Sequence, residues 1–203
     1  SFCMCPGGFI VPAATSPGEV VVNGMSPSKR NNLYANSGIV VEINVDKDIP
    51  KYEKFGALKG LEYQKNLERL AFTSGGRTQT APAQRLTDFV EGNLSVDLNP
   101  TSYQPGLNSA PLHSLLPKLI GSRLRQGFKA FGDKMHGYYT VEANIVGVES
   151  RTSSPVSIPR NEKLEHPVIK GLFPCGEGGG YAGGIVSAAM DGERCAEAAM
   201  AGL

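Results

Sequence analysis

A glycine-rich stretch near the C-terminus, residues 171–192, constrains this chain more than any other part of the sequence. It opens with an apolar pair at 172–173, passes through Gly176, Glu177 and further glycines, and leads into an alanine-rich run. Glycines at such a turn allow positive φ angles and let the main chain approach a ligand closely. The start of a helix behind them carries unpaired N–H donors and a partial positive charge, which favour an anion. The order predicts a strand, a tight turn and a helix over residues 171–203.

The segment from Gly178 to Gly183 formally fits the G-x-G-x-x-G pattern of dinucleotide-binding proteins. In a Rossmann unit, however, a second strand with an acidic residue follows roughly 20 residues later. The residues after Gly183 read as a single helix, so this is not a first βα unit. A P-loop is excluded as well, because no Gly-Lys-Ser/Thr follows. Two interpretations remain: a turn that cradles a ligand, or a turn that only packs a helix against a sheet.

Residues 171–192 resemble the C-terminal flavin-binding motif of a family of FAD-dependent, NAD(P)/FAD-utilising dehydrogenases with a glutathione-reductase-like FAD domain. Three N-terminal segments resemble the middle region of the same family: residues 3–8, 20–26 and 34–40. The resemblance implies that Glu177 accepts a hydrogen bond from a ribityl hydroxyl of FAD, with a helix dipole behind it from about Gly183. The residues implied to bind the cofactor are Gly176, Glu177, Gly178, Gly179, Gly180, Tyr181, Ala182 and Gly183.

The same resemblance implies that the chain is the C-terminal part of a longer enzyme, whose N-terminal βαβ unit lies outside these residues. The fold class expected is an α+β fragment of an FAD/NAD(P)-binding α/β protein, with an antiparallel β region, inserted helices and a closing strand–helix. The implied reaction is hydride transfer through FAD, with NAD(P)H as a co-substrate and a small molecule as substrate. Without the missing half, we expect the chain alone to be inactive. Two alternatives stay open: a non-catalytic binding or interaction domain, and a flavin monooxygenase or reductase of another class.

The hydrophobic pattern divides the chain into four segments. Residues 1–45 are expected to be β-rich, residues 46–137 to be a mainly helical insert, residues 138–170 to return to strand and then a linker, and residues 171–203 to form the closing strand–turn–helix. Ile39, Val41, Ile43 and Val45 alternate with Val40, Glu42 and Asn44, and this period of two predicts a half-buried strand.

Helical spacing of apolar residues predicts three helices in the insert. The first covers residues 46–72, with Asp48 as its cap and Pro50 in its first turn. A short one is expected around residues 86–90, and a longer one over residues 111–135 that Pro117 restarts.

Cys3 and Cys5 are candidate catalytic residues, because they form a Cys-x-Cys pair in front of Pro-Gly-Gly. Three interpretations are open for them: simple burial as small apolar side chains, a position next to the flavin or substrate, and half of a metal site. The three histidines show no metal-ligand spacing, so no metal site is predicted.

The composition limits the partners. Lys+Arg 20 against Asp+Glu 19 leaves no basic field for nucleic acid. No apolar run is long enough for a membrane span, and the four unevenly spaced cysteines favour a reduced, cytoplasmic protein. A C-terminal part without its partner half exposes apolar surface, which makes a homo-oligomer a further expectation.

Overall fold

The computed structural model describes Ser1 and residues 3–202, so Phe2 and Leu203 lie outside the described residues. The chain divides into two compact units. Unit 1 comprises Ser1–Asp48 and Lys65–Ser150, and unit 2 comprises Ile49–Gln64 and Arg151–Leu203. The strands described all lie in unit 1 together with several helices, and unit 2 contains helices joined by long connections, so the chain has the mixed α and β content expected. The four-segment division of the sequence stays a prediction.

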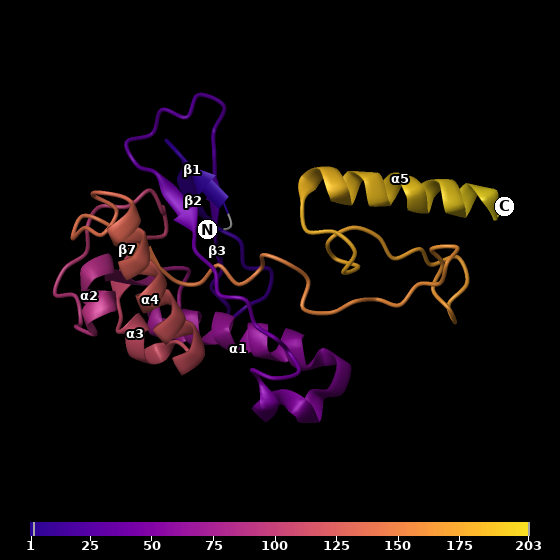
Figure 1. The fold of residues 1–203 in the computed structure, drawn as a ribbon, viewed down its shortest axis with the longest axis horizontal. Helices are drawn as coiled ribbons and strands as arrows, with labels where there is room; N and C mark the ends of the chain where they lie inside the picture. Colours follow the sequence, from indigo (N-terminus) through magenta and orange to yellow (C-terminus); the bar gives the residue numbers. More distant parts are fainter. Residues whose placement is uncertain (2, 203) are drawn as a thin grey trace. The chain divides into compact units, whose positions relative to one another are not determined.

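Two antiparallel strand pairs form the start of unit 1. Strand β1 (Cys3–Cys5) pairs with β4 (Asn36–Gly38), and β2 (Phe9–Pro12) pairs with β3 (Val22–Met25) (Figure 1). The expected antiparallel β region is therefore confirmed for this stretch.

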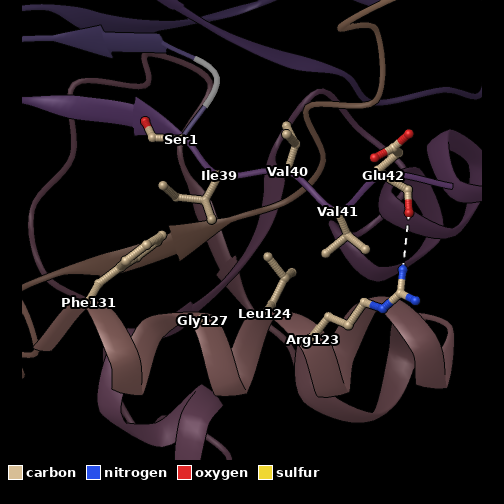
Figure 2. Close-up of a pocket in the computed structure, with 9 residues that line it drawn as sticks. All are labelled: Ser1, Ile39, Val40, Val41, Glu42, Arg123, Leu124, Gly127 and Phe131. Atoms are coloured by element: carbon tan, nitrogen blue, oxygen red, sulfur yellow. Dashed lines mark hydrogen bonds between the residues drawn. The ribbon is translucent and has the colours of Figure 1, made fainter. Parts of the chain in front are cut away.

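The strand predicted for residues 39–45 is wrong. Residues 39–44 form no strand, although their burial still alternates, with Ile39, Val41 and Ile43 half-buried and Val40 and Glu42 exposed. The apolar side chains are buried because the segment lies over helix α4 (Lys118–Lys134) rather than beside another strand (Figure 2). The alternation therefore identified three of the four side chains expected to face inward, since Val45 is exposed, but it did not identify a neighbouring strand.

The helix predicted over residues 46–72 is two elements. A 3₁₀ helix, η1 (Pro50–Leu58), precedes α1 (Lys59–Ser74), and Gly56 within η1 has a non-helical φ of 53°. Pro50 lies in the first turn as expected. Asp48 does not cap the helix, because its carboxylate accepts a hydrogen bond from the Asn44 N–H (2.8 Å) while Ile49 takes the cap position.

A three-stranded sheet that the sequence did not predict occupies the middle of unit 1. Its central strand β5 (Ala81–Arg85) runs parallel to β6 (Leu107–Ser109) and antiparallel to β7 (Asn144–Val146). Four of the five β5 residues are buried. Of the long strand expected after residue 138, only β7 forms.

The helices of unit 1 cover this sheet with an apolar core. They are α2 (Leu86–Glu91), α3 (Leu112–Leu115) and α4, and Pro117 begins α4 as predicted. Residues buried between them are Leu86, Phe89, Val90, Leu112, Leu116 and Phe128. A second cluster joins the β3 region to the end of α1 and to β5: Val20, Val22, Ala71, Ala81 and Tyr103. Burial of apolar area in these two clusters is the main stabilising contribution to unit 1.

Unit 2 ends in the helix predicted from about Gly183, which is α5 (Ile185–Ala201), with Gly184 at its N-cap. Figure 1 shows α5 in yellow, with the orange segment before it folded back along it. Residues 171–173 form no strand. The Leu172 carbonyl instead accepts a hydrogen bond from the His166 N–H (2.8 Å), which turns this segment back on its own loop. Within the residues described, none of the helices is both long and apolar enough to cross a membrane.

Candidate functional site

The glycine-rich segment folds as a series of tight turns in front of α5. The Gly180 N–H donates to the Glu177 carbonyl (2.9 Å), and the Tyr181 N–H donates to the Gly176 carbonyl (3.0 Å). Gly176 and Gly180 have φ angles of 66° and 83°, which side-chain-bearing residues rarely adopt. A Cβ atom at Gly180 would also lie 2.7 Å from the Val156 carbonyl oxygen. These two glycines are therefore required by the turn itself.

One buried carboxylate on α5 ties this turn to the helix. Asp191 accepts two hydrogen bonds from Arg160, from Nη1 to Oδ2 (2.9 Å) and from Nη2 to Oδ1 (2.8 Å). Its Oδ2 also accepts the Gly176 N–H (2.9 Å). The bidentate Arg160 pair and this amide lower the pKa of Asp191 to about 2. The carboxylate is therefore ionised at any physiological pH and fixes the start of the turn.

Arg160 and Tyr181 hold the other side of the turn. The guanidinium carbon lies 3.6 Å from the centre of the Tyr181 ring, which makes a cation–π contact. The Tyr181 hydroxyl donates to the Ile158 carbonyl (2.7 Å), and the Ile158 N–H donates to the Gly179 carbonyl (3.1 Å). Segment 157–160 and the turn thus form one hydrogen-bonded structure.

Arg160 and Asp191 were not among the site residues predicted from the sequence. Arg160 lies in what reads as a polar linker, and Asp191 is an acidic residue in an alanine-rich helix. An acidic side chain between small apolar residues is the one signal that could have suggested a buried partner.

Next to the turn lies a hollow of about 320 Å³. Its lining comes from Ser153, Ser154, Gly180, Tyr181, Ala182 and Gly183. A Cβ atom at Gly178 or Gly183 would meet no atom within 4 Å, and neither residue has a positive φ. Neither backbone strain nor packing within the described chain explains glycine at these two positions.

The polar groups at this hollow suit an acceptor-rich ligand. Within residues 1 and 3–202, no acceptor is found for the main-chain N–H groups of Glu177, Gly178, Ala182 and Gly183. The first turn of the 17-residue helix α5 follows directly, and its Ile185 is 92% exposed. Exposed N–H donors at a helix start can bind phosphate or carbonyl oxygens. Glu177 is exposed and adds a carboxylate that can accept hydrogen bonds from hydroxyl groups.

Cys3 and Cys5 lie in β1 of unit 1, whereas the glycine turn belongs to unit 2. Cys5 is buried, and Cys3 is half-buried. Burial raises the pKa of the Cys3 thiol, and the Glu149 carboxylate and the Cys5 thiol raise it further, against a main-chain hydrogen bond at Gly38 that lowers it. A raised pKa keeps the thiol protonated and therefore a poor nucleophile. The geometry favours burial among the three interpretations of this pair, and a catalytic role stays a prediction.

Unit 1 has a second hollow, of about 270 Å³, between residues 39–42 and α4. Figure 2 shows the side chains of Ile39 and Val41 directed toward α4, and the Leu124 side chain directed from α4 toward them. At its rim, the Arg123 guanidinium donates to the Glu42 carbonyl (3.2 Å). Arg123 and Glu42 bring one cation and one carboxylate to the rim of this otherwise mainly apolar lining, which suits a small, largely apolar molecule. The described residues contain no group of three or more His, Cys, Asp or Glu side chains that could hold a metal ion.

Comparison with known proteins gives two findings. Residues 1–152 match the family described as "FAD-dependent protein, C-terminal domain-like". An uncharacterised protein of Clostridium beijerinckii is 41% identical over 199 residues, which cover 97% of this chain and 37% of that protein. The chain therefore spans little more than a third of the length of this relative. The family match ends before the glycine turn, whereas the similarity to the relative extends across almost the whole chain.

Proposed function

Because this chain belongs to the FAD-dependent protein C-terminal domain-like family, we propose that it is part of an FAD-dependent oxidoreductase and supplies one side of the flavin site. The observation that carries this proposal is the turn at residues 176–183, which offers unpaired N–H donors in front of α5 and two glycines, Gly178 and Gly183, that the chain's own packing does not require. The residues present therefore fit a cofactor with phosphate, hydroxyl and carbonyl groups.

In this proposal, the N–H groups of Ala182 and Gly183 donate to oxygen atoms of FAD, and Glu177 accepts from a ribityl hydroxyl. The partial positive charge at the start of α5 stabilises negative charge on the bound cofactor. FAD supplies the capacity to accept or donate hydride, and the chain orients it. The proposed reaction transfers hydride between NAD(P)H and a small-molecule substrate. The four cysteines are all free thiols, and we place the protein in the cytoplasm.

The test uses the protein at its full natural length. We expect a yellow protein whose visible spectrum shows bound flavin and which releases FAD on denaturation. NAD(P)H oxidation that depends on an added electron-accepting dye and consumes no oxygen would support a dehydrogenase, and oxygen consumption would instead favour the monooxygenase class. A full-length protein that neither carries flavin nor takes it up would contradict the proposal and favour a non-catalytic binding domain.

Glu177→Ala is expected to weaken FAD retention about tenfold, the factor that the loss of one hydrogen bond to a charged group carries. The reason is that the exposed carboxylate is free to meet a hydroxyl of the cofactor. FAD release would be followed by flavin fluorescence in the full-length protein. Glu193→Ala, an exposed carboxylate farther along α5, and Cys5→Ser in unit 1 serve as controls. Equal retention in all three variants would remove Glu177 from the site.

We assign the small-molecule substrate, or part of it, to the hollow of unit 1, and Gly127 provides a test. Gly127→Ala is expected to raise the free energy of unfolding by about 1 kcal/mol, because alanine favours the helix interior and its Cβ meets no atom within 4 Å. The same methyl group would enter the hollow and weaken binding of the apolar anionic probe anilinonaphthalene sulfonate. The matched control is Gly132→Ala on the same helix, whose Cβ would lie 2.7 Å from Tyr139 Cβ and should destabilise the fold. Unchanged probe binding in Gly127→Ala would contradict the assignment.

A further inference from the structure

Two cysteines that are 20 positions apart in the sequence meet at the glycine turn. Cys175 directly precedes Gly176 and is exposed, and Cys195 lies on α5 and is buried. The Cys195 Sγ lies 3.8 Å from the Pro174 carbonyl oxygen, the carbonyl of the peptide bond to Cys175. The Cys195 sulfur therefore lies beside the main chain that leads into Cys175, and the two thiol side chains are within hydrogen-bond reach of each other.

The surroundings of the two thiols differ. Burial raises the pKa of Cys195 and the Arg160 guanidinium lowers it, while the Asp191 carboxylate and the hydrogen bond that the Cys195 thiol makes with the Cys175 side chain raise it further. Arg160 Nη1 also donates to the Cys195 Sγ (3.4 Å), so a thiolate formed there would have a cation beside it. The Cys175 thiol is thus accessible to reagents in solution, whereas the Cys195 thiol is buried and its sulfur accepts a hydrogen bond from Arg160.

We propose that Cys175 and Cys195 form a peroxide-oxidisable dithiol that closes to a disulfide. The exposed Cys175 thiolate attacks a peroxide oxygen, which breaks the O–O bond and leaves Cys175 as a sulfenic acid with release of hydroxide. Cys195 then loses its proton and attacks the Cys175 sulfur, and water leaves. The two thiols lose two electrons together, and the peroxide gains them.

The disulfide would join the start of the glycine turn to α5 by a covalent bond, beside the Arg160–Asp191 pair. Closing it requires an S–S distance of about 2 Å and a specific dihedral angle, which neighbouring side chains on a loop and a helix can reach by small movements. The proposal is independent of FAD, because the oxidant is a peroxide and both sulfurs belong to this chain.

The chain offers a direct readout. Trypsin cleaves after Lys170 and Arg194, so Cys175 lies in peptide 171–194 and Cys195 begins the next one. The full-length protein would be treated with hydrogen peroxide, the remaining thiols alkylated, and the digest analysed by mass spectrometry without reduction. We expect the two peptides to appear joined, with a mass lower by two hydrogen atoms than their sum, and to separate when dithiothreitol is added.

Two variants identify the steps. In Cys195→Ala, the sulfenic acid of Cys175 should persist and react with dimedone, whereas the parent protein should give no dimedone product at that position. In Cys175→Ala, Cys195 should stay a thiol at the same peroxide concentration, because it is buried. The Cys3–Cys5 pair serves as an internal comparison, since these thiols are half-buried or buried. Oxidation of Cys175 to sulfinic or sulfonic acid without a joined peptide would overturn the proposal, as would a Cys175 that remains unmodified.

Discussion

Phe89→Ala is expected to lower the free energy of unfolding of unit 1 by about 3–5 kcal/mol, the range for removing a fully buried phenylalanine. Phe89 is 0% exposed and lies at the centre of the core between α2, α3 and α4. Its ring contacts that of Phe128 edge to face, with 6.0 Å between centroids and 87° between planes. The substitution removes both this contact and the apolar area, and the helices on either side limit how far the cavity can close.

Hydrogen exchange of amides in α4 would measure this effect in the full-length protein, because these amides should exchange through opening of the core. The control is Phe9→Ala in β2, where the side chain is 38% exposed and less than half of the loss is expected. Similar protection in the two variants would show that the cluster around Phe89 does not dominate the stability of unit 1.

Local patterns predicted the helices of unit 1 well. The apolar spacing of α4, the short α2 and the restart at Pro117 depend on residues within a few turns of one another. The end of α1 before two glycines is also a local signal. In each case, the information that determines the element lies inside the element.

The sheet could not be predicted in the same way. Strand β5 reads Ala-Pro-Ala-Gln-Arg, which contains no β-branched or aromatic residue, and its partners lie around residues 108 and 145. Its strand character comes from pairing and burial rather than from its own sequence. Gln84 illustrates this, because it is fully buried and its side chain satisfies polar groups of Asn93 and His113.

The site shows the same division. The glycine pattern predicted the turn and the helix start, because positive φ and a helix N-terminus are properties of a short segment. It did not predict the Arg160–Asp191 pair, whose residues are separated by 31 positions, nor the missing strand at 171–173. Contacts between distant segments hold the turn in place, and no local pattern encodes them.

Asp191→Ala is expected to have the largest effect on the proposed flavin site. The substitution leaves the Arg160 guanidinium without its bidentate partner and the Gly176 N–H without its acceptor. The turn at residues 176–183 would then lose the contacts that fix it to α5, and FAD retention in the full-length protein should fall by about tenfold or more. Flavin fluorescence after gel filtration would measure the loss.

Two measurements distinguish loss of the Arg160–Asp191 pair from a failure of the flavin proposal itself. Trypsin cleavage after Arg160 should become faster in Asp191→Ala whether or not FAD binds, because the guanidinium loses both hydrogen bonds to the carboxylate and keeps only its weaker contacts with Pro174, Tyr181 and Cys195. In acid, the lowered pKa of Asp191 predicts that its contribution to stability is complete above about 3.8 and is lost as the pH falls through about 2. Between pH 3.8 and about 2, the parent protein should therefore lose this contribution to its free energy of unfolding, whereas Asp191→Ala has no such contribution to lose.

Faster cleavage with unchanged FAD retention would mean that Asp191 holds the turn but that the turn does not hold the cofactor. Unchanged cleavage would mean that the Arg160–Asp191 pair does not fix the turn at all.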